Sequence, residues 1–303
     1  MTTTLTRRRS AFLALLLAFT LVALSLLTAC SKDASGSDGQ SKPIRIGVVG
    51  ASDPYWATYV QTAKDAGIDI ELVDFTDYAL PNPALTEGDL DINQFQHIVY
   101  LANYIATSGK DLVPLGSTAI YPLSLFSKKY TSVADIPDGA TVVIPDDPSN
   151  QARGLLVLQS AGLVTLKGGG SIFSSLADID QANSRVKVTE VAADLTPSSL
   201  NDAAAAIINN DYVVDAGLSF DDAIAKDDPS DPNALPYVNI FAVRPEDKDN
   251  ATYLKLVELF QDTTAVTDGL QEVSGGVAEI VKIPQADLQA ALDKTVADTK
   301  AQG

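Results

Sequence analysis

A strand–helix–strand pattern at residues 43–75 most constrains the fold of this chain. Residues 43–50 and 68–75 are apolar runs typical of strands, and a helix is expected between them from about Pro54 until Gly67 stops it. Consecutive strands joined through a helix lie parallel, with a right-handed crossover. Further strands are expected at 112–126, 140–145, 185–191, 212–216 and 237–244, and helices at 149–161, 197–208, 250–261 and 284–299. This alternation predicts an α/β protein.

Residues 74–104 contain an unusual mixture of side chains. They hold the only histidine, His97, several amides, and five aromatic residues: Phe75, Tyr78, Phe95, Tyr100 and Tyr104. Rings, a histidine and amides together suit a pocket for a small molecule with an apolar body and polar ends. The alternative interpretation is that the rings are half-buried packing residues and His97 is a structural histidine.

Local signals in the same stretch predict its secondary structure. Asn82-Pro83 is typical of a helix start, and Gly88 is typical of a helix end. Residues 89–92 alternate between polar and apolar as a strand does. Asn93 is then predicted to cap a longer helix.

The stretch resembles the ligand-binding segment of the methionine-binding lipoprotein family, the NlpA-type substrate-binding proteins of ABC importers. The family pattern is F-x-D-Y-x-x-P-N-x-A-L-x-x-G-x-x-D-x-N-x-F-Q-H-x-x-Y-L, and every fixed position is present from Phe75 to Leu101. Val99 departs from the proline that is usual before the final Tyr-Leu pair. The resemblance implies a two-lobe, periplasmic-binding-protein-like α/β fold with the ligand in the cleft between lobes. It places lobe 1 at 44–121 and 241–303, and lobe 2 at 122–240.

A second segment, which ends at Arg153, resembles the family motif P-N-D-P-x-N-x-x-R. Ser149 or Asn150 is expected to cap a helix and so to put Arg153 in its first turn. A helix N-terminus and a guanidinium both favour a carboxylate. The alternative is that Arg153 pairs with Asp146, Asp147 or another neighbouring acid.

Two more matches concern asparagines. Residues 206–218 and 237–244 resemble the family patterns A-x-I-N-x-x-Y-A-x-x-A-G-L and Y-x-N-x-x-x-x-R, and place Asn209 and Asn239 at ligand positions. Asparagine is otherwise a common cap or turn residue.

The resemblance also assigns roles to these residues. Arg153 would bind the α-carboxylate of methionine, and Asn209 and Asn239 its head group. The thioether would lie against Tyr78, Phe95, His97 and Tyr100, because sulfur packs well on rings. Phe95 and His97 lie two residues apart, so both face the ligand only if the following helix begins near residue 96.

The N-terminus is predicted to be a lipoprotein signal. Arg7-Arg8-Arg9 precedes an apolar run, and residues 27–30, LTAC, read as a lipobox that ends at Cys30. Residues 1–29 would be removed, Cys30 diacylated, and residues 30–43 would be a flexible tether. The resemblance implies a lipid-anchored protein on the extracytoplasmic face of the cell membrane, and we expect a monomer. The alternatives are a single transmembrane helix and, from Arg8-Arg9, a twin-arginine signal.

Composition limits the remaining possibilities. The net charge is −18, and removal of the signal's three arginines makes it more negative, which argues against nucleic-acid binding. One histidine and one lipidated cysteine cannot assemble a usual zinc site, and no motif for another cofactor is present. We therefore expect no cofactor and no enzymatic activity. The family resemblance implies a receptor that delivers methionine or a close analogue to the permease and ATPase of an ABC importer. Another small apolar amino acid or a methionine peptide is the alternative ligand, and a surface hydrolase that uses His97 is the remote one.

Overall fold

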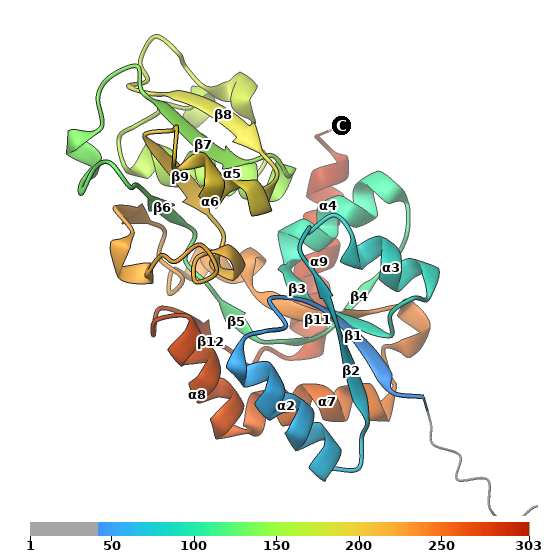
Figure 1. The fold of residues 1–303 in the computed structure, drawn as a ribbon. Helices are drawn as coiled ribbons and strands as arrows, with labels where there is room; N and C mark the ends of the chain where they lie inside the picture. The colour runs from blue at the N-terminus through green and yellow to red at the C-terminus, as the bar shows by residue number, and fades with distance from the viewer. Residues whose placement is uncertain (1–41, 303) are drawn as a thin grey trace, which may run out of the picture. The chain divides into compact units, whose positions relative to one another are not determined.

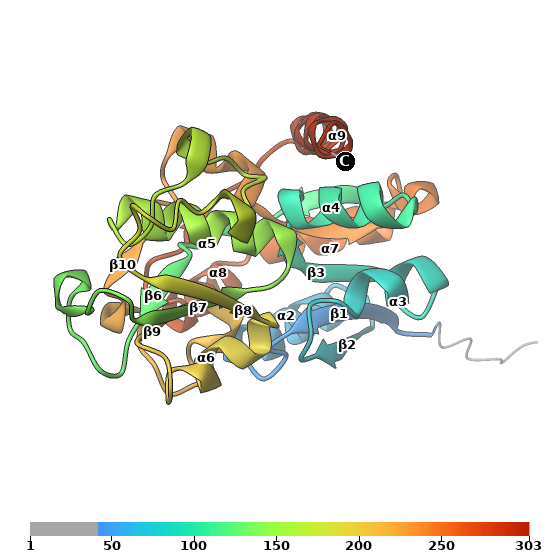
Figure 2. The same ribbon diagram turned by 90° about the horizontal axis from the view of Figure 1, so that it is seen from above.

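The computed structural model describes residues 42–302, so the predicted signal, Cys30 and nearly all of the tether lie outside it. The described residues contain two five-stranded sheets, each with helices packed on it (Figure 1, Figure 2). The strands are β1 (Ile44–Val49), β2 (Ile70–Phe75), β3 (Ile92–His97), β4 (Val113–Ser117), β5 (Ala119–Ile120), β6 (Ser124–Phe126), β7 (Thr141–Pro145), β8 (Lys187–Val191), β9 (Ala205–Ile208), β10 (Ala225–Lys226), β11 (Asn239–Val243) and β12 (Glu279–Ile280). The α-helices are α2 (Pro54–Asp65), α3 (Pro81–Glu87), α4 (Ile98–Ser108), α5 (Pro148–Ser160), α6 (Thr196–Ser199), α7 (Ala251–Asp262), α8 (Thr264–Val273) and α9 (Gln285–Lys300).

The first sheet has the strand order β2-β1-β3-β11-β4. Strand β1 pairs parallel with β2 and β3, whereas β11 runs antiparallel to β3 and β4. The predicted strand–helix–strand unit is therefore confirmed at its predicted place. The chain leaves this sheet after β4, builds the second sheet and returns through β11. Because β11 begins at Asn239, the predicted lobe limit at 240–241 falls inside this strand.

Aromatic side chains fill the core between this sheet and helices α2, α7 and α8. Phe260 of α7 is central, with ring centroids 5.8 Å from Trp56, 5.3 Å from Tyr59 and 5.3 Å from Phe241. Edge-to-face and tilted contacts of this kind add to the free energy gained from burial. The apolar stripe of α7 is thus core, since Leu256, Val257 and Phe260 are all buried.

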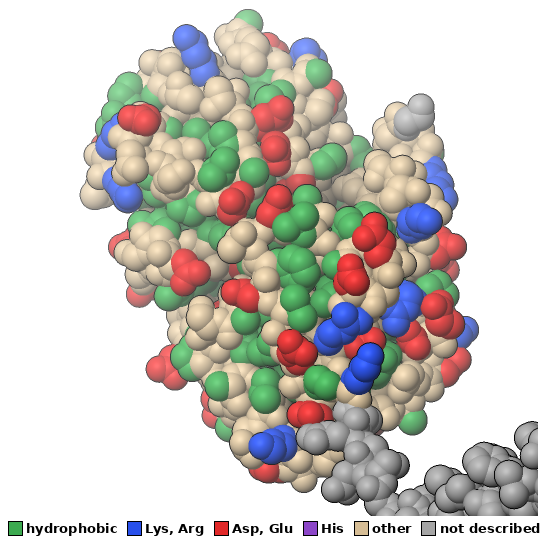
Figure 3. All heavy atoms as spheres, turned by 45° about the vertical axis from the view of Figure 1, so that its right-hand side comes forward, with side chains coloured by type: hydrophobic (Ala, Val, Ile, Leu, Met, Phe, Trp, Pro, Cys, Tyr) green, Lys and Arg blue, Asp and Glu red, His purple; other side chains and the backbone are tan. Residues whose placement is uncertain are grey.

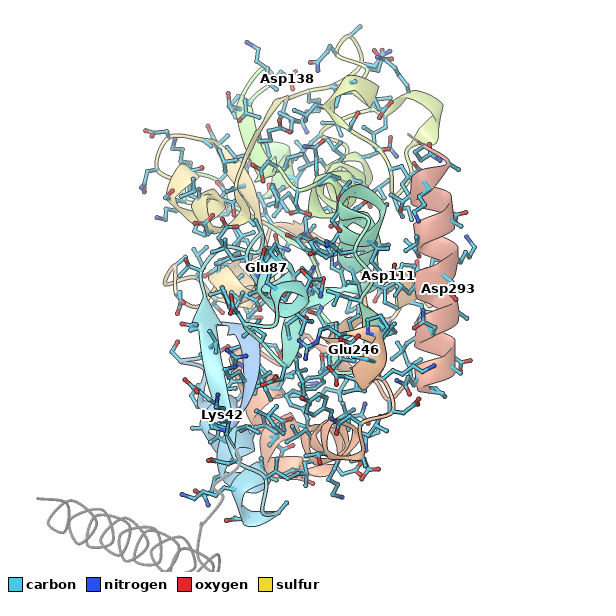
Figure 4. All side chains as sticks on the ribbon, turned by 90° about the vertical axis from the view of Figure 1, so that its right-hand side faces the viewer. Lys42, Glu87, Asp111, Asp138, Glu246 and Asp293 are labelled. Atoms are coloured by element: carbon cyan, nitrogen blue, oxygen red, sulfur yellow. The ribbon has the colours of Figure 1, made fainter. Side chains whose placement is uncertain are left out.

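The opposite face of the first sheet is covered by α3, α4 and α9. Leu288 and Leu292 of α9 are buried in this second core, whereas Asp293 lies on the outer side of the helix (Figure 4). The C-terminal helix therefore completes the first lobe. On the face shown in Figure 3, Lys and Arg side chains are scattered in small groups among acidic ones.

A close approach on the first core gives a testable prediction. A Cβ added to Gly116 on β4 would lie 2.3 Å from Cγ1 of Val257, whereas one added to Gly154 inside α5 meets nothing closer than 3.5 Å. We expect Gly116→Ala to destabilise the protein by about 1–3 kcal/mol through overpacking. Gly154→Ala should instead stabilise it by roughly 0.5–1 kcal/mol, because alanine favours a helix interior. Urea unfolding measures both, and Val257→Ala should partly rescue Gly116→Ala. An unchanged stability of Gly116→Ala would show that β4 and α7 are not in close contact.

The second sheet has the order β10-β6-β9-β7-β8. Here two sequence-based predictions are wrong. The segment predicted as a helix, 197–208, forms only the short α6 and then strand β9, and the segment predicted as a strand, 212–216, is a turn. All four residues of β9 are buried between β6 and β7. A short, fully apolar run cannot be assigned by periodicity, because a strand buried on both faces has no polar side.

Candidate functional site

All seven residues predicted for the site line one cavity between the two sheets. They are Tyr78, Phe95, His97, Tyr100, Arg153, Asn209 and Asn239, and the cavity is completed by Gln96, Tyr121, Pro122, Leu123, Asn150 and Asn210. The empty space between these side chains is about 370 Å³, part of it open to solvent. The structure thus brings together residues that lie far apart in the sequence.

The start of α4 differs from the prediction in a way that helps the site. Asn93 does not cap this helix: it lies in β3, where its amide donates to Oδ1 of Asn82 at 2.9 Å. The cap is His97, and the helix begins at Ile98. Phe95 and His97 are therefore on a strand, where residues two apart point to the same face. This satisfies the condition that the helix begins near residue 96.

The start of α3 also differs from the prediction. Helix α3 begins at Pro81, not after an Asn82 cap, although Gly88 ends it in a left-handed conformation as predicted. Asn82 is needed elsewhere, since its side chain is buried and hydrogen bonded to Gln96 at 2.7 Å. A polar network holds β3, so the amides of this strand serve structure as well as the site.

Aromatic rings form one wall of the cavity. Tyr78 and Phe95 have ring centroids 5.8 Å apart, and Tyr100 lies edge-on to both, at 6.1 Å and 5.6 Å. Tyr212 extends the group, 5.1 Å from Tyr78. The rings therefore pack on one another and also face the cavity. An apolar, polarisable side chain fits against such a wall.

His97 is held as a neutral ring with both nitrogens engaged. Its Nδ1 accepts from the backbone N–H of Tyr100 at 3.1 Å. Its Nε2 lies 3.3 Å from Oδ1 of Asn150, an oxygen that accepts because the Nδ2 of Asn150 donates to Asp147. Nε2 must therefore carry the proton. Burial, with a smaller contribution from the charge of Arg153, lowers the pKa of His97 to about 3.

We expect the imidazole of His97 to show no titration between pH 5 and pH 8. Because His97 is the only histidine, its ring signals in an NMR spectrum need no assignment by mutation. The folded-state pKa of about 3 lies below the unfolded value near 6.5, so the unfolded chain binds more protons between them. This group therefore favours folding fully above pH 6.5 and progressively less as the pH falls towards 3. A midpoint near pH 6.5 would mean that the ring is exposed to solvent.

Arg153 lies deeper in its helix than predicted. The cap of α5 is Asp147, whose carboxylate accepts from the N–H of Asn150 at 2.9 Å, and the helix begins at Pro148. The predicted cap at Ser149 or Asn150 is therefore wrong, and Arg153 lies in the second turn. Because Arg153 lies more than one turn from the helix N-terminus, the positive charge beside it comes mainly from its own guanidinium and not from the helix end.

The guanidinium of Arg153 is held on three sides. Its Nε donates to Asp227 at 2.6 Å, and its Nη2 donates to Asp227 at 3.2 Å and to the carbonyl oxygen of Tyr121 at 2.7 Å. The plane lies over the ring of Tyr237, 4.2 Å from its centroid. The acid that pairs with Arg153 is thus distant in sequence, and neither Asp146 nor Asp147. No local spacing signals Asp227, whereas Asn150 stands within the quoted motif, one helical turn before Arg153.

The two predicted asparagines present amide groups to the cavity. Nδ2 of Asn209 donates to Asn150 at 3.0 Å, while its Oδ1 is buried without a hydrogen-bond partner among residues 42–302. Asn239 enters from β11, where it pairs with His97 of β3. A buried carbonyl oxygen without a donor costs free energy, so a bound N–H group would stabilise Asn209.

The rim of the cavity connects the two sheets. Tyr78, from the first lobe, donates to Asp211 at 2.7 Å, and Tyr212 donates to the carbonyl oxygen of Thr76 at 3.0 Å. Burial, aided by the charge of Asp53, raises the pKa of Asp211 to about 7. Asp211 and Tyr212 lie in the turn that follows Asn209. A ligand bound to Asn209 would therefore lie next to the two hydrogen bonds that join the lobes.

Among residues 42–302, Arg153 is the only ionised group that lines the cavity. No other Lys or Arg and no Asp or Glu of that range lines it, and His97 is neutral. A guanidinium of the kind that binds carboxylates, neutral amides nearby and an aromatic wall together suit a small amino acid with an apolar side chain. Within residues 42–302, no group of three or more His, Cys, Asp and Glu side chains is placed to hold a metal ion. None of the helices in that range has the length and apolarity needed to cross a membrane.

Comparison with known proteins agrees with this geometry. The family model described as NlpA lipoprotein matches residues 44–280. A Pasteurella multocida protein named probable D-methionine-binding lipoprotein MetQ is 36% identical over 268 residues, which covers 86% of this chain and 96% of the relative.

Solved structures give the same result. The substrate-binding protein of a methionine transporter from Streptococcus pneumoniae has a TM-score of 0.73 at 32% identity, covering 79% of this chain and 95% of that one. A nutrient-binding protein from Burkholderia cenocepacia bound to methionine has a TM-score of 0.72 at 36% identity, covering 78% and 99%. The predicted family resemblance and the two-lobe binding-protein fold are confirmed.

Proposed function

The chain belongs to the NlpA lipoprotein family, and we propose that it captures methionine, or a close analogue, and delivers it to the permease and ATPase of an ABC importer. The main support is the cavity, where one guanidinium, several neutral amides and an aromatic wall meet between two sheets. Among amino acids with an apolar side chain, we choose methionine as the ligand because the similar proteins are named for it.

Each lining residue has a proposed role. Arg153 binds the α-carboxylate through a charge-assisted hydrogen bond. Asn209 accepts from the ammonium group through its free Oδ1, and Asn239 binds the head group from the opposite strand. Tyr78, Phe95, His97 and Tyr100 surround the thioether. Closure of lobe 2 (122–240) on lobe 1 (44–121 and 241–303) around the ligand is the state that the permease recognises.

The protein acts from the membrane surface without catalysis. Cys30 is diacylated after removal of residues 1–29, and the tether lets a monomeric body reach the permease on the extracytoplasmic face. His97 has no free nitrogen to act as a base, because Nδ1 accepts from Tyr100 and Nε2 donates to Asn150. Hydrolysis of an ester or peptide that is lost in His97→Gln would contradict this part of the proposal.

Thermal melting with a panel of free amino acids and methionine dipeptides tests the function. A ligand that binds only the folded state raises the melting temperature. We expect methionine to give the largest shift. A larger shift with another apolar amino acid would retain the binding function and replace the ligand. A folded, ligand-free protein that no member of the panel stabilises would overturn the proposal.

A further inference from the structure

The hydrogen bonds of Arg153 leave only one of its nitrogens for a ligand. Nε and Nη2 are both bonded to Asp227, and Nη2 also donates to the carbonyl oxygen of Tyr121. Nη1 has no hydrogen-bond partner within residues 42–302. A free guanidinium can bind a carboxylate through two parallel hydrogen bonds. In Arg153 the edge formed by Nε and Nη2 already binds Asp227 in this way.

We propose that Asp227 is a positioning residue for ligand binding: it orients Arg153 so that the ligand carboxylate is held through Nη1. The inference rests on the proposed function, because it concerns the same site. Asp227 does not line the cavity itself, so it acts through Arg153.

Asp227 is itself firmly placed. Its Oδ1 accepts from the backbone N–H of Leu123 at 2.8 Å, and its own N–H donates to the carbonyl oxygen of Leu123 at 3.2 Å. Leu123 and Tyr121 belong to the segment by which the chain passes between the sheets, and both line the cavity. Asp227 therefore holds Arg153 against residues 121–123 of the cavity lining. The ring of Tyr237, over which the guanidinium lies, further limits how the guanidinium can move.

The charge of Asp227 has a second consequence. Arg153 is almost fully buried, with 6% of its side chain exposed, and an unpaired buried cation is costly. Asp227 supplies the counter-charge before the ligand arrives, so the empty site is nearly neutral. Such a site suits a zwitterion better than a simple anion. The charge of Asp227 repels the ligand carboxylate and by itself would weaken binding. The gain from holding Arg153 in the binding orientation must therefore be larger than this repulsion.

The test compares methionine with methioninol, which has the same side chain and ammonium group but no carboxylate. Dissociation constants are measured by calorimetry or melting series for the wild type, Asp227→Ala, Asp227→Asn and Asp227→Glu. We expect Asp227→Ala to weaken methionine binding about tenfold and to change methioninol binding less than twofold, as loss of an oriented charge-assisted hydrogen bond predicts. Asp227→Asn, which keeps one accepting oxygen, should lose less, and Asp227→Glu should restore part of the loss.

A matched control and two contrary outcomes make the test decisive. Asp228→Ala removes the neighbouring carboxylate, whose hydrogen bonds among residues 42–302 go only to Ser230. This variant should change the affinity for neither methionine nor methioninol. Equal losses for methionine and methioninol would mean that Asp227 merely supports the fold, and an unchanged or higher methionine affinity would mean that it only neutralises charge. Either result overturns the inference. If Asp227→Ala does not fold, the same comparison is made with Asp227→Asn. A wild-type protein that binds neither compound would instead overturn the proposed function.

Discussion

Replacing Arg153 by alanine is expected to lower the affinity for methionine by roughly tenfold to a hundredfold. A hydrogen bond to a charged group is worth about 1.5–3 kcal/mol, and about 1.4 kcal/mol corresponds to a factor of ten. No other Lys or Arg of the described part of the chain lines the cavity, so none of them replaces the lost charge. Calorimetric titration of the two proteins with methionine measures the effect.

The same substitution should also destabilise the fold, by about 2–3 kcal/mol, because it leaves the partner of a buried ion pair behind. The value is smaller than that of about 3–5 kcal/mol for a fully buried pair, since 29% of the Asp227 side chain is exposed and water can solvate it. Arg185→Ala is the control: this arginine pairs with Asp138 at the surface of the same lobe and donates to the carbonyl oxygen of Ile136, so its loss should leave methionine binding unchanged and cost about 1 kcal/mol of stability at most. Unchanged methionine binding in Arg153→Ala would remove the arginine from the site.

Phe260→Ala is expected to give the largest loss of stability, about 3–5 kcal/mol, through the cavity left in the aromatic core. Phe260 is 2% exposed and contacts rings from α2 and β11, so its loss weakens the packing of α7 against both of these elements. Urea unfolding measures the change. Lys255→Ala on the exposed side of the same helix should cost only a few tenths of a kcal/mol, because it removes a surface pair with Glu258. Similar values for the two variants would contradict this packing.

Periodic and punctuated segments of the fold could be predicted from the sequence. Strands β1 and β2 and helices α2, α5, α7 and α9 form near their predicted positions. The local sequence is enough to indicate an amphipathic helix or a strand that is bounded by turn residues. Strand β9 could not be predicted: its four residues are apolar without alternation, and only pairing with β6 and β7 decides between helix and strand.

The candidate site shows the same division. His97 and Arg153 stand in long motifs and could be found by resemblance, but Asp227, the acid that pairs with Arg153, could not. Asp227 reaches Arg153 across 74 residues of sequence, and its loop has no spacing that indicates an ion pair. The cap at His97 was missed because asparagine is the commoner cap, whereas here Asn93 is used in a buried strand.

The most direct test of the account is a calorimetric titration with methionine of protein that has been unfolded, freed of any co-purified ligand and refolded. We expect saturable binding of one methionine per chain, at the cavity between the sheets that Arg153 lines together with His97 and Asn209. Refolded protein with a normal melting transition and no saturable heat would contradict it.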